Sequence, residues 1–385
     1  MATWAQRDNR VELKTRLGTF WAEMPDGWRL DDCHPAALAV AEWLLFHNIP
    51  ALQEECISLE ALKQLPYRAR PPHSKTILCY SAGADSTAAL MLLPRETTIP
   101  VYCRRPYDSY RRSDGIPIKL ATFAPIQRCL DKVGGVVQVP SVLETMGPAA
   151  GLRHGFHDGY GYAVMACLLA DHYGAGTVAF GSVMEQVFMG AGNNYTDIIK
   201  MASSRWQMCR QLFRVAGLDF ALPTGGCSEV LTERTARSGP YGEVIVSCPT
   251  ADASNRPCGT CFKCFRKLRI AGTSAPEPDK NVVAVLKKRP LKSATSVVYA
   301  CQKAGWWKVA SLAEYRDVDL GFLERYHGYA VDYLLSVELA SHVHNRMAEL
   351  GVQSMNPEEE AKLRRIGQTF WPEAFSRTRA GLPDL

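Results

Sequence analysis

Short apolar runs alternate with amphipathic stretches through the middle of the chain. The runs rich in β-branched and aliphatic residues lie at 76–80, 101–103, 136–139, 177–180 and 243–246. The amphipathic stretches lie near 86–93, 118–133, 160–173, 195–216 and 227–237. Because strict alternation of strands and helices is typical of a parallel sheet with helices on both faces, the pattern predicts an α/β fold. Ligands bind such sheets beyond the carboxyl ends of the strands, so we look for chemistry in the loops that follow them.

The two ends of the chain carry different patterns. Residues 11–22 alternate like a β-hairpin, and residues 35–47 predict a helix. In the last part of the chain, apolar residues recur every four positions and indicate the packed face of a helix. These residues are Val331, Leu335, Leu339, Val343 and Met347.

Two proline-containing stretches, 69–73 and 273–279, indicate linkers, because proline fixes φ and removes a hydrogen-bond donor. They predict three parts along the chain. These parts are an N-terminal extension at 1–73, an α/β domain at 74–278 and a helical C-terminal domain at 279–385. The chemistry is expected in the middle part.

Composition excludes several classes of protein. With 385 residues, 22% of them charged, and a net charge of +5, the chain is globular and carries no general signal for nucleic acid binding. Charged residues within the first thirteen positions, such as Arg7 and Glu12, do not fit a signal peptide. The longest apolar run, 162–170, is about half of the roughly 18 residues that a membrane-spanning helix needs. We therefore expect a soluble, cytoplasmic protein with no membrane partner, in which the 13 cysteines are thiols or metal ligands.

The first apolar run ends in a loop of small residues that leads into strong helix formers. The loop consists of Ser81, Ala82, Gly83, Ala84, Asp85, Ser86 and Thr87. A strand, a short loop and a helix amino terminus gather N–H groups and the positive end of the helix dipole around an anion, so the loop predicts a phosphate site. Asp85 beside phosphates indicates a Mg²⁺ ion between them. The alternative is that Asp85 or Ser86 only caps the helix.

Four cysteines have the spacing of a metal site. Cys258, Cys261 and Cys264 form a CxxCxxC motif, and nine residues separate Cys248 from Cys258. Four thiolates close a tetrahedral Zn²⁺ site of structural type. Cys227 is an alternative fourth ligand, and an iron–sulfur cluster is the competing metal centre. Lys263, Arg266, Lys267 and Arg269 make the adjoining segment basic, which predicts either an anionic ligand or a solvated face.

The segment SAGADS at 81–86 resembles the SGGxDS loop of the PP-loop ATP pyrophosphatases, which bind ATP there and transfer AMP to a substrate oxygen. Together with the four cysteines, residues 74–272 resemble the 7-cyano-7-deazaguanine synthases. That family adenylates the carboxylate of 7-carboxy-7-deazaguanine, lets ammonia displace AMP to give an amide, and dehydrates the amide to a nitrile in a second activation. The resemblance implies a PP-loop fold of the adenine nucleotide alpha hydrolase (HUP) type, with ATP, Mg²⁺ and Zn²⁺.

The resemblance also assigns roles to residues. It places the loop residues from Ser81 to Thr87 on ATP, together with Gly181 and Ser182. Asp85 and Asp197 are the expected catalytic residues. The expected substrate-binding residues are Tyr195, Asp197, Glu185 and His157. Asp197 alternatively caps a helix, and Glu185 alternatively is a solvated loop charge.

The sequence departs from the family at informative positions. Ala82 stands where the family has glycine, which costs little unless φ is positive there. Thr196, Ile198 and Ile199 replace the proline, cysteine and arginine of the family's YPDCR segment. The lysine that the family has at a later helix start is absent from 224–229. These departures predict retained ATP activation and an altered substrate pocket.

The acceptor of the activated group therefore stays open. The product is an amide, a nitrile or a conjugate, and the substrate is expected to be a small deazapurine-like molecule. One alternative is conjugation of a deazaguanine to a protein partner in a bacterial anti-phage system. Others are a tRNA-modifying PP-loop enzyme and a non-catalytic zinc-ribbon scaffold. Nucleic acid as a partner is left open, and we expect a homodimer or a subunit of a complex.

Overall fold

A computed structural model describes residues 2–65, 74–105, 123–152, 155–188, 205–248, 251–252 and 254–372. The chain forms two compact units, both discontinuous in sequence. Unit 1 consists of Met1–Ser81, Arg95–Ala179 and Met208–Ala221, and unit 2 consists of Ala82–Pro94, Phe180–Gln207 and Leu222–Leu385. The three-part division at residues 73 and 278 stays a prediction.

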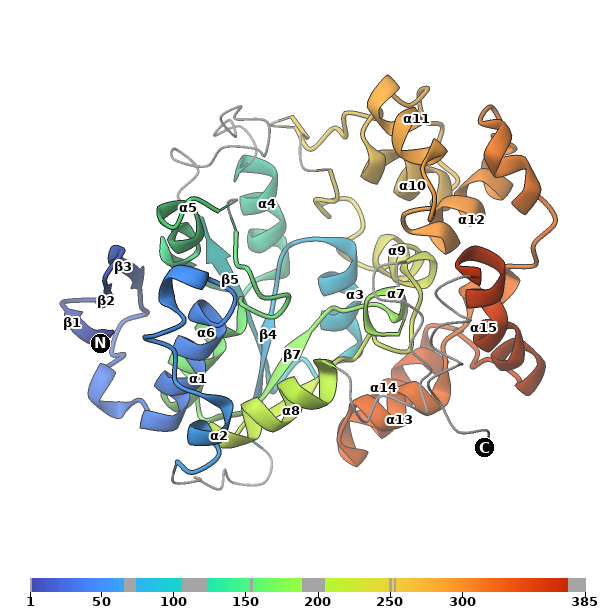
Figure 1. The fold of residues 1–385 in the computed structure, drawn as a ribbon. Helices are drawn as coiled ribbons and strands as arrows, with labels where there is room; N and C mark the ends of the chain where they lie inside the picture. The colour runs from blue at the N-terminus through green and yellow to red at the C-terminus, as the bar shows by residue number, and fades with distance from the viewer. Residues whose placement is uncertain are drawn as a thin grey trace. The chain divides into compact units, whose positions relative to one another are not determined.

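Unit 1 is built on a five-stranded sheet with the order β6-β5-β4-β7-β8. Figure 1 labels three of these strands, β4, β5 and β7. Its strands are β4 (Lys75–Cys79), β5 (Thr98–Arg104), β6 (Val137–Pro140), β7 (Ala175–Phe180) and β8 (Asp219–Ala221). Val101 of β5 pairs in parallel register with Cys79 of β4 and with Val137 of β6. The predicted α/β fold with a parallel sheet and flanking helices is confirmed.

One predicted strand is wrong. Residues 243–246 form no strand, and the N–H group of Val246 instead donates to the carbonyl of Ala82 at 2.9 Å. The fifth strand is β8, which pairs with β7 through Phe220 and Val178. A three-residue strand that carries a single large apolar side chain leaves no β-branched run in the sequence, so the pattern missed it.

Helices flank the sheet of unit 1, and one of them, α6, is apolar over most of its length. The helices are α1 (Pro35–Phe46), α2 (Leu59–Leu62), α4 (Phe123–Val133), α5 (Met146–Ala149), α6 (Ala163–Tyr173) and most of α8 (Arg205–Val215). Helix α6 buries every residue from Ala163 to Ala170 and packs against α1, β4 and β5. A helix that is apolar all round belongs in a core.

The start of the chain forms a second, antiparallel sheet. Its strands are β1 (Thr3–Arg7), β2 (Arg10–Thr15) and β3 (Gly18–Glu23). Ala22 of β3 bridges to Ser141, which follows β6. The hairpin predicted at 11–22 and the helix predicted at 35–47 are both confirmed.

Unit 2 is helical. Its helices are α3 (Ala84–Leu92), α7 (Met184–Val187), α9 (Glu229–Ser238), α10 (Phe262–Ile270), α11 (Lys280–Lys287), α12 (Ala294–Ala304), α13 (Gly328–Leu334), α14 (Val337–Glu349) and α15 (Pro357–Phe370). Helix α3 packs on α9, and α10 packs on α12. The four-residue stripe starting at Val331 is not one helix, because Ser336 interrupts it and its side chain caps α14 by accepting from the N–H of Leu339.

The sheet order reverses between β4 and β7. Strands β5 and β6 extend the sheet on one side of β4, whereas β8 extends it beyond β7. In sheets of this kind, ligands bind beyond the carboxyl ends of the two strands at the reversal. Along the chain, residues 80–83 follow β4 and residues 181–183 follow β7. Among the residues that the structure describes, every helix is too short or too polar to cross a lipid bilayer.

Candidate functional site

The loop after β4 enters α3 through Gly83, the N-cap residue, whose backbone is extended. Ser86 donates its hydroxyl to the carbonyl of Gly83 at 3.1 Å, and Thr87 donates its N–H to the same carbonyl at 2.9 Å. The alternative in which Asp85 or Ser86 caps the helix is therefore wrong. Asp85 lies in the first turn of the helix, where the dipole favours a negative charge.

Ala82 carries strain. Its φ is +60°, and the residue is fully buried. The left-handed conformation costs an L-residue roughly 1–2 kcal/mol, because Cβ approaches the following carbonyl oxygen. Alanine is therefore costly at this position, where the resembling family has glycine. The loop adopts the left-handed conformation nonetheless.

Gly181 lies against the first turn of α3. A Cβ atom built on it would lie 2.6 Å from the backbone of Asp85 and of Ser86. Only glycine permits this close approach. The carbonyl of the next residue, Ser182, accepts a hydrogen bond from the Thr224 hydroxyl at 3.0 Å. The segment after β7 is thus held between α3 and the chain that leads into α9.

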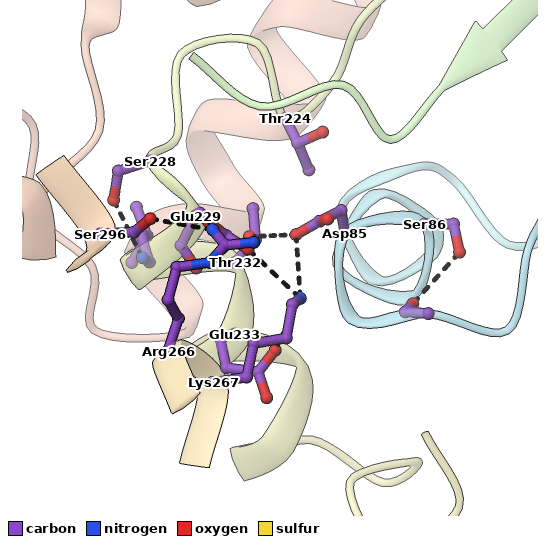
Figure 2. A network of polar contacts seen from close by, with 12 residues as sticks. Asp85, Ser86, Thr224, Ser228, Glu229, Thr232, Glu233, Arg266, Lys267 and Ser296 are labelled. Atoms are coloured by element: carbon purple, nitrogen blue, oxygen red, sulfur yellow. Dashed lines mark hydrogen bonds and ion pairs between the residues drawn. The ribbon is translucent and has the colours of Figure 1, made fainter. Parts of the chain in front are cut away.

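Asp85 belongs to a buried acid–base cluster with residues of α9 and α10. Its Oδ1 accepts a hydrogen bond from Thr232 at 2.7 Å and lies 3.8 Å from Nζ of Lys267 (Figure 2). The same Nζ donates to Glu233 Oε2 at 2.9 Å and lies 3.9 Å from Glu229 Oε1. One buried ammonium group therefore serves three carboxylates.

Burial and charge act in opposite directions on these groups. Burial and the charges of Glu229 and Glu233 raise the pKa of Asp85, against Lys267 and the Thr232 hydrogen bond. For Lys267, burial favours the neutral amine, but the surrounding carboxylates outweigh it and raise the pKa above its ordinary value. The ammonium form is therefore the one that the cluster stabilises.

Glu229 begins α9 and is held by Arg266. The guanidinium Nη1 donates to Glu229 Oε2 and, at 3.0 Å, to the hydroxyl of Ser296 (Figure 2). Burial opposes ionisation of Glu229, but Arg266 and Lys267 outweigh it and hold the pKa below its usual value. Ser228 caps the helix by accepting the N–H of Leu231 at 3.0 Å.

Glu185 in α7 has the opposite environment. Its Oε2 accepts the backbone N–H of Glu229 at 2.9 Å, and Thr295 donates its hydroxyl to Oε1 at 3.4 Å. Burial, followed by the charge of Glu229, raises the pKa of Glu185 to about 8. Glu185 is only 8% exposed, so the alternative of a solvated loop charge is wrong. A carboxylic acid that is protonated at neutral pH is able to donate a hydrogen bond.

These side chains border a cavity of about 170 Å³. Its charged lining residues are Asp85, Glu185, Glu229, Lys263, Arg266 and Lys267. Ser293, Ala294, Thr295 and Trp371 also line it. Because Arg266 and Lys267 are buried, the solvated-face interpretation of the basic segment is wrong for these two residues. Arg269 is buried as well, but it donates to the carbonyls of Phe265 and Pro276 and is structural.

The four cysteines predicted as metal ligands come together. Their sulfur atoms all lie within 4.8 Å of one another, and the Sγ atoms of Cys258 and Cys264 are 3.9 Å apart. Zinc–sulfur bonds of about 2.3 Å in a tetrahedron place the sulfurs roughly 3.8 Å apart, so the set fits such an ion. The N–H groups of Cys258 and Cys264 donate to the sulfurs of Cys248 and Cys261, each at 3.4 Å. The cluster therefore can hold a metal, and Cys227, at the start of α9, is not part of it.

Several predicted residues are not placed by this geometry. Tyr195 and Asp197 lie outside the described residues and stay predictions. His157 lies in unit 1, where its carbonyl accepts a hydrogen bond from Asn48 at 3.1 Å. Its predicted role in substrate binding likewise stays a prediction.

Sequence reasoning missed the acidic half of the cluster. Glu229 and Glu233 are four residues apart on α9, and Lys263 and Lys267 have the same spacing on α10. Residues at this spacing share one face of a helix. Charges on the faces of two neighbouring amphipathic helices were the signal that could have found the cluster.

A known protein family matches part of the chain. Residues 208–367 match a family of unknown function, DUF6395, which is less than half of the chain. The match includes the four cysteines, α9, α10 and α12, but neither the loop at 81–87 nor Glu185. No curated protein matches the chain.

Proposed function

We propose that this chain is an ATP-dependent adenylating enzyme of the PP-loop ATP pyrophosphatase type. It activates a carboxylate of a 7-carboxy-7-deazaguanine-type base for attack by ammonia or an amine. The observation that carries the proposal is that Asp85 lines the same cavity as Lys263 and Lys267. Asp85 belongs to the loop, and the lysines belong to the helix that starts within the cysteine motif. The two motifs behind the resemblance thus meet at one cavity.

Two further observations support nucleotide chemistry here. The sheet order reverses between β4 and β7, the strands whose following segments carry the loop and Gly181. Gly181 also lacks the side chain that would collide with the first turn of α3. A loop backbone held this closely, with a helix amino terminus behind it, is suited to binding phosphate.

The activation step asks mainly for placement and charge stabilisation. A carboxylate oxygen of the substrate forms a bond to the α-phosphorus of ATP, and the bond to the leaving pyrophosphate breaks. Negative charge develops on the phosphate oxygens, and Lys263, Arg266 and Lys267 bring positive charge to the cavity. The amine then bonds to the acyl carbon, AMP leaves with the former carboxylate oxygen, and the amine loses a proton. With ammonia the product is an amide, and a second activation removes its oxygen to give the nitrile.

Mg²⁺, when bound, would neutralise charge between the phosphates and a carboxylate. Asp85 fits this role, because it lies in the first turn of α3 and its side chain is 27% exposed. Apart from the four cysteines, the described part of the chain brings no three His, Cys, Asp or Glu side chains into metal-binding distance. Mg²⁺ is usually held by one or two carboxylates plus substrate phosphates, so no larger acidic set is required.

Zn²⁺ would have a structural role. Four cysteine ligands leave no open coordination position. Cys261 is the N-cap of α10, and Cys264 lies in its first turn. A metal on these residues would fix the start of the helix that carries Lys263 and Lys267.

The test is to incubate the purified protein with ATP and 7-carboxy-7-deazaguanine, with and without ammonia. We expect AMP and pyrophosphate to form, and the amide or nitrile to be detected by mass when ammonia is present. The Asp85→Asn variant should lose this turnover while keeping the circular dichroism spectrum of the wild type. Absence of both AMP and a mass change would refute the proposal, and unaltered turnover in Asp85→Asn would remove Asp85 from the mechanism.

A further inference from the structure

One wall of the cavity is formed by the start of helix α12. Helix α12 begins at Ala294, and its N-cap residue, Ser293, has a φ of 51° and makes no side-chain cap. Ala294 and Thr295 line the cavity and are fully buried. The first N–H groups of a helix have no acceptor within the helix, and they carry the positive end of its dipole.

Two further residues of the cavity lining carry unsatisfied hydrogen-bond donors. Nε of Arg266 and Nε1 of Trp371 are buried, and neither has a hydrogen-bond partner among the described residues. Arg266 is 7% exposed and Trp371 is 3% exposed, and both line the cavity. Native structures satisfy nearly all buried polar groups, so two unsatisfied donors beside a helix amino terminus indicate an acceptor that comes from a ligand.

The charges of the lining indicate which kind of acceptor fits. Three basic side chains, Lys263, Arg266 and Lys267, line the cavity together with the acidic side chains of Asp85, Glu185 and Glu229. Glu229 is paired with Arg266, and Lys267 is shared by Asp85, Glu229 and Glu233. Basic side chains in the lining favour an acceptor that carries a negative charge.

We infer that Arg266, Trp371 and the amino terminus of α12 form the subsite that holds the carboxylate of the acceptor substrate. A carboxylate has one negative charge and accepts only, through two oxygens with about four lone pairs, so it suits a wall of N–H donors. At about 170 Å³ the cavity is smaller than the roughly 300 Å³ of a full ligand pocket, so it holds part of a ligand. The choice of this carboxylate rests on the proposed function, whereas the donor wall does not.

The test separates the carboxylate from the rest of the ligand. Trp371→Phe keeps an aromatic ring and removes only the N–H group. Titration calorimetry would measure binding of 7-carboxy-7-deazaguanine, of 7-deazaguanine without the carboxylate, and of pyrophosphate. We expect Trp371→Phe to weaken binding of the carboxylated base about five- to tenfold, as the loss of one hydrogen bond predicts, and to leave the other two ligands unchanged.

A second variant and a control distinguish the loss of a hydrogen-bond donor from misfolding. Arg266→Lys keeps a positive charge beside Glu229 and lacks the Nε–H donor, so it should show the same selective loss. Trp306→Phe removes a buried indole whose N–H donates to Glu277 at 3.0 Å, away from the cavity lining, and should bind like the wild type.

Three other outcomes would overturn the inference. Equal weakening with both bases would mean that Trp371 only shapes the cavity. Weakening with pyrophosphate alone would assign the wall to the leaving group. If the wild type bound none of the carboxylated base, benzoate or acetate at millimolar concentration, this wall would not be a carboxylate subsite. Selective loss of carboxylate binding without any AMP formation would instead refute the proposed function and leave the subsite standing.

Discussion

The carboxylate of Asp85 lies 3.8 Å from the ammonium group of Lys267, which also donates to Glu233 at 2.9 Å. Asp85 belongs to the loop that follows β4, and Lys267 belongs to the helix that starts at the cysteine motif. Lys267 is 5% exposed and Glu233 is fully buried, so the charges of the cluster depend on one another for stability. The pair therefore links the loop to the helix that begins within the four-cysteine cluster.

Replacing Lys267 with methionine should be strongly destabilising. The substitution leaves Asp85, Glu229 and Glu233 near one another without the shared ammonium, and breaking a buried ion pair costs about 3–5 kcal/mol. Urea unfolding would measure the loss. Lys303→Met is the matched control, because Lys303 pairs with Glu324 at 3.3 Å but is 51% exposed, so it should cost less than about 1 kcal/mol. If both substitutions lowered the free energy of unfolding equally, the stabilising role of Lys267 in the buried cluster would be contradicted.

Replacing Ala82 with glycine should stabilise the protein. Glycine adopts the φ of +60° without the Cβ conflict, so the free energy of unfolding should rise by roughly 1 kcal/mol, less the entropy that glycine adds to the unfolded chain. Ala88→Gly, in the interior of α3, should instead cost about 1 kcal/mol. We expect the two substitutions to change the free energy of unfolding in opposite directions, as measured by thermal or urea unfolding. A loss of stability in both variants would show that Ala82 is not strained.

Replacing Gly181 with alanine should displace the first turn of α3. The new Cβ would lie 2.6 Å from the backbone of Asp85 and Ser86, and backbone cannot yield as a flexible side chain does. We expect a loss of about 1–3 kcal/mol in unfolding free energy and weaker ATP binding by calorimetry. Gly321→Ala is the control, since its nearest neighbour, an oxygen of Asp319, lies 3.4 Å away. Wild-type affinity for ATP in Gly181→Ala would contradict a role of this contact in the loop.

The sequence predicted the fold class and the two motifs, because each leaves a local pattern. Four of the five strands of the parallel sheet follow from apolar runs, and the four-cysteine cluster follows from CxxCxxC spacing. The cluster around Lys267 could not be predicted in the same way, because its geometry depends on how α9 and α10 pack. The positive φ of Ala82 could be suspected only from the glycine that the resembling family has at this position, since alanine itself gives no sign of a left-handed conformation. Trp371 was missed for the same reason as the cluster: only tertiary structure brings it to the cavity.

Glu185 should make stability depend on pH. The pKa is raised from 4.5 to about 8 in the folded protein, so between these values the unfolded chain ionises while the folded protein keeps its proton. The wild type should therefore lose up to about 1.4 kcal/mol of stability per pH unit from this group as pH rises through that window. Glu185→Gln imitates the protonated form and lacks this loss. The difference in unfolding free energy between Glu185→Gln and the wild type should widen from pH 5 to about pH 8 and then level off. A difference that stays constant with pH would contradict the raised pKa of Glu185.

The cysteine cluster should hold a single zinc ion per chain. Elemental analysis by mass spectrometry would identify the metal, and an iron–sulfur cluster would instead give iron and visible absorption. Cys264→Ser removes one of the four converging sulfurs and should lower the zinc content well below that of the wild type. Cys227→Ser is the matched control, because Cys227 is equally buried but lies outside the cluster, so the zinc content of this variant should be unchanged.

Since Cys261 and Cys264 begin the helix that carries Lys267, removal of the metal by a chelator should also weaken ATP binding, and zinc should restore it. If a chelator removed the zinc and ATP binding did not change, the metal would have no role in shaping the ATP site.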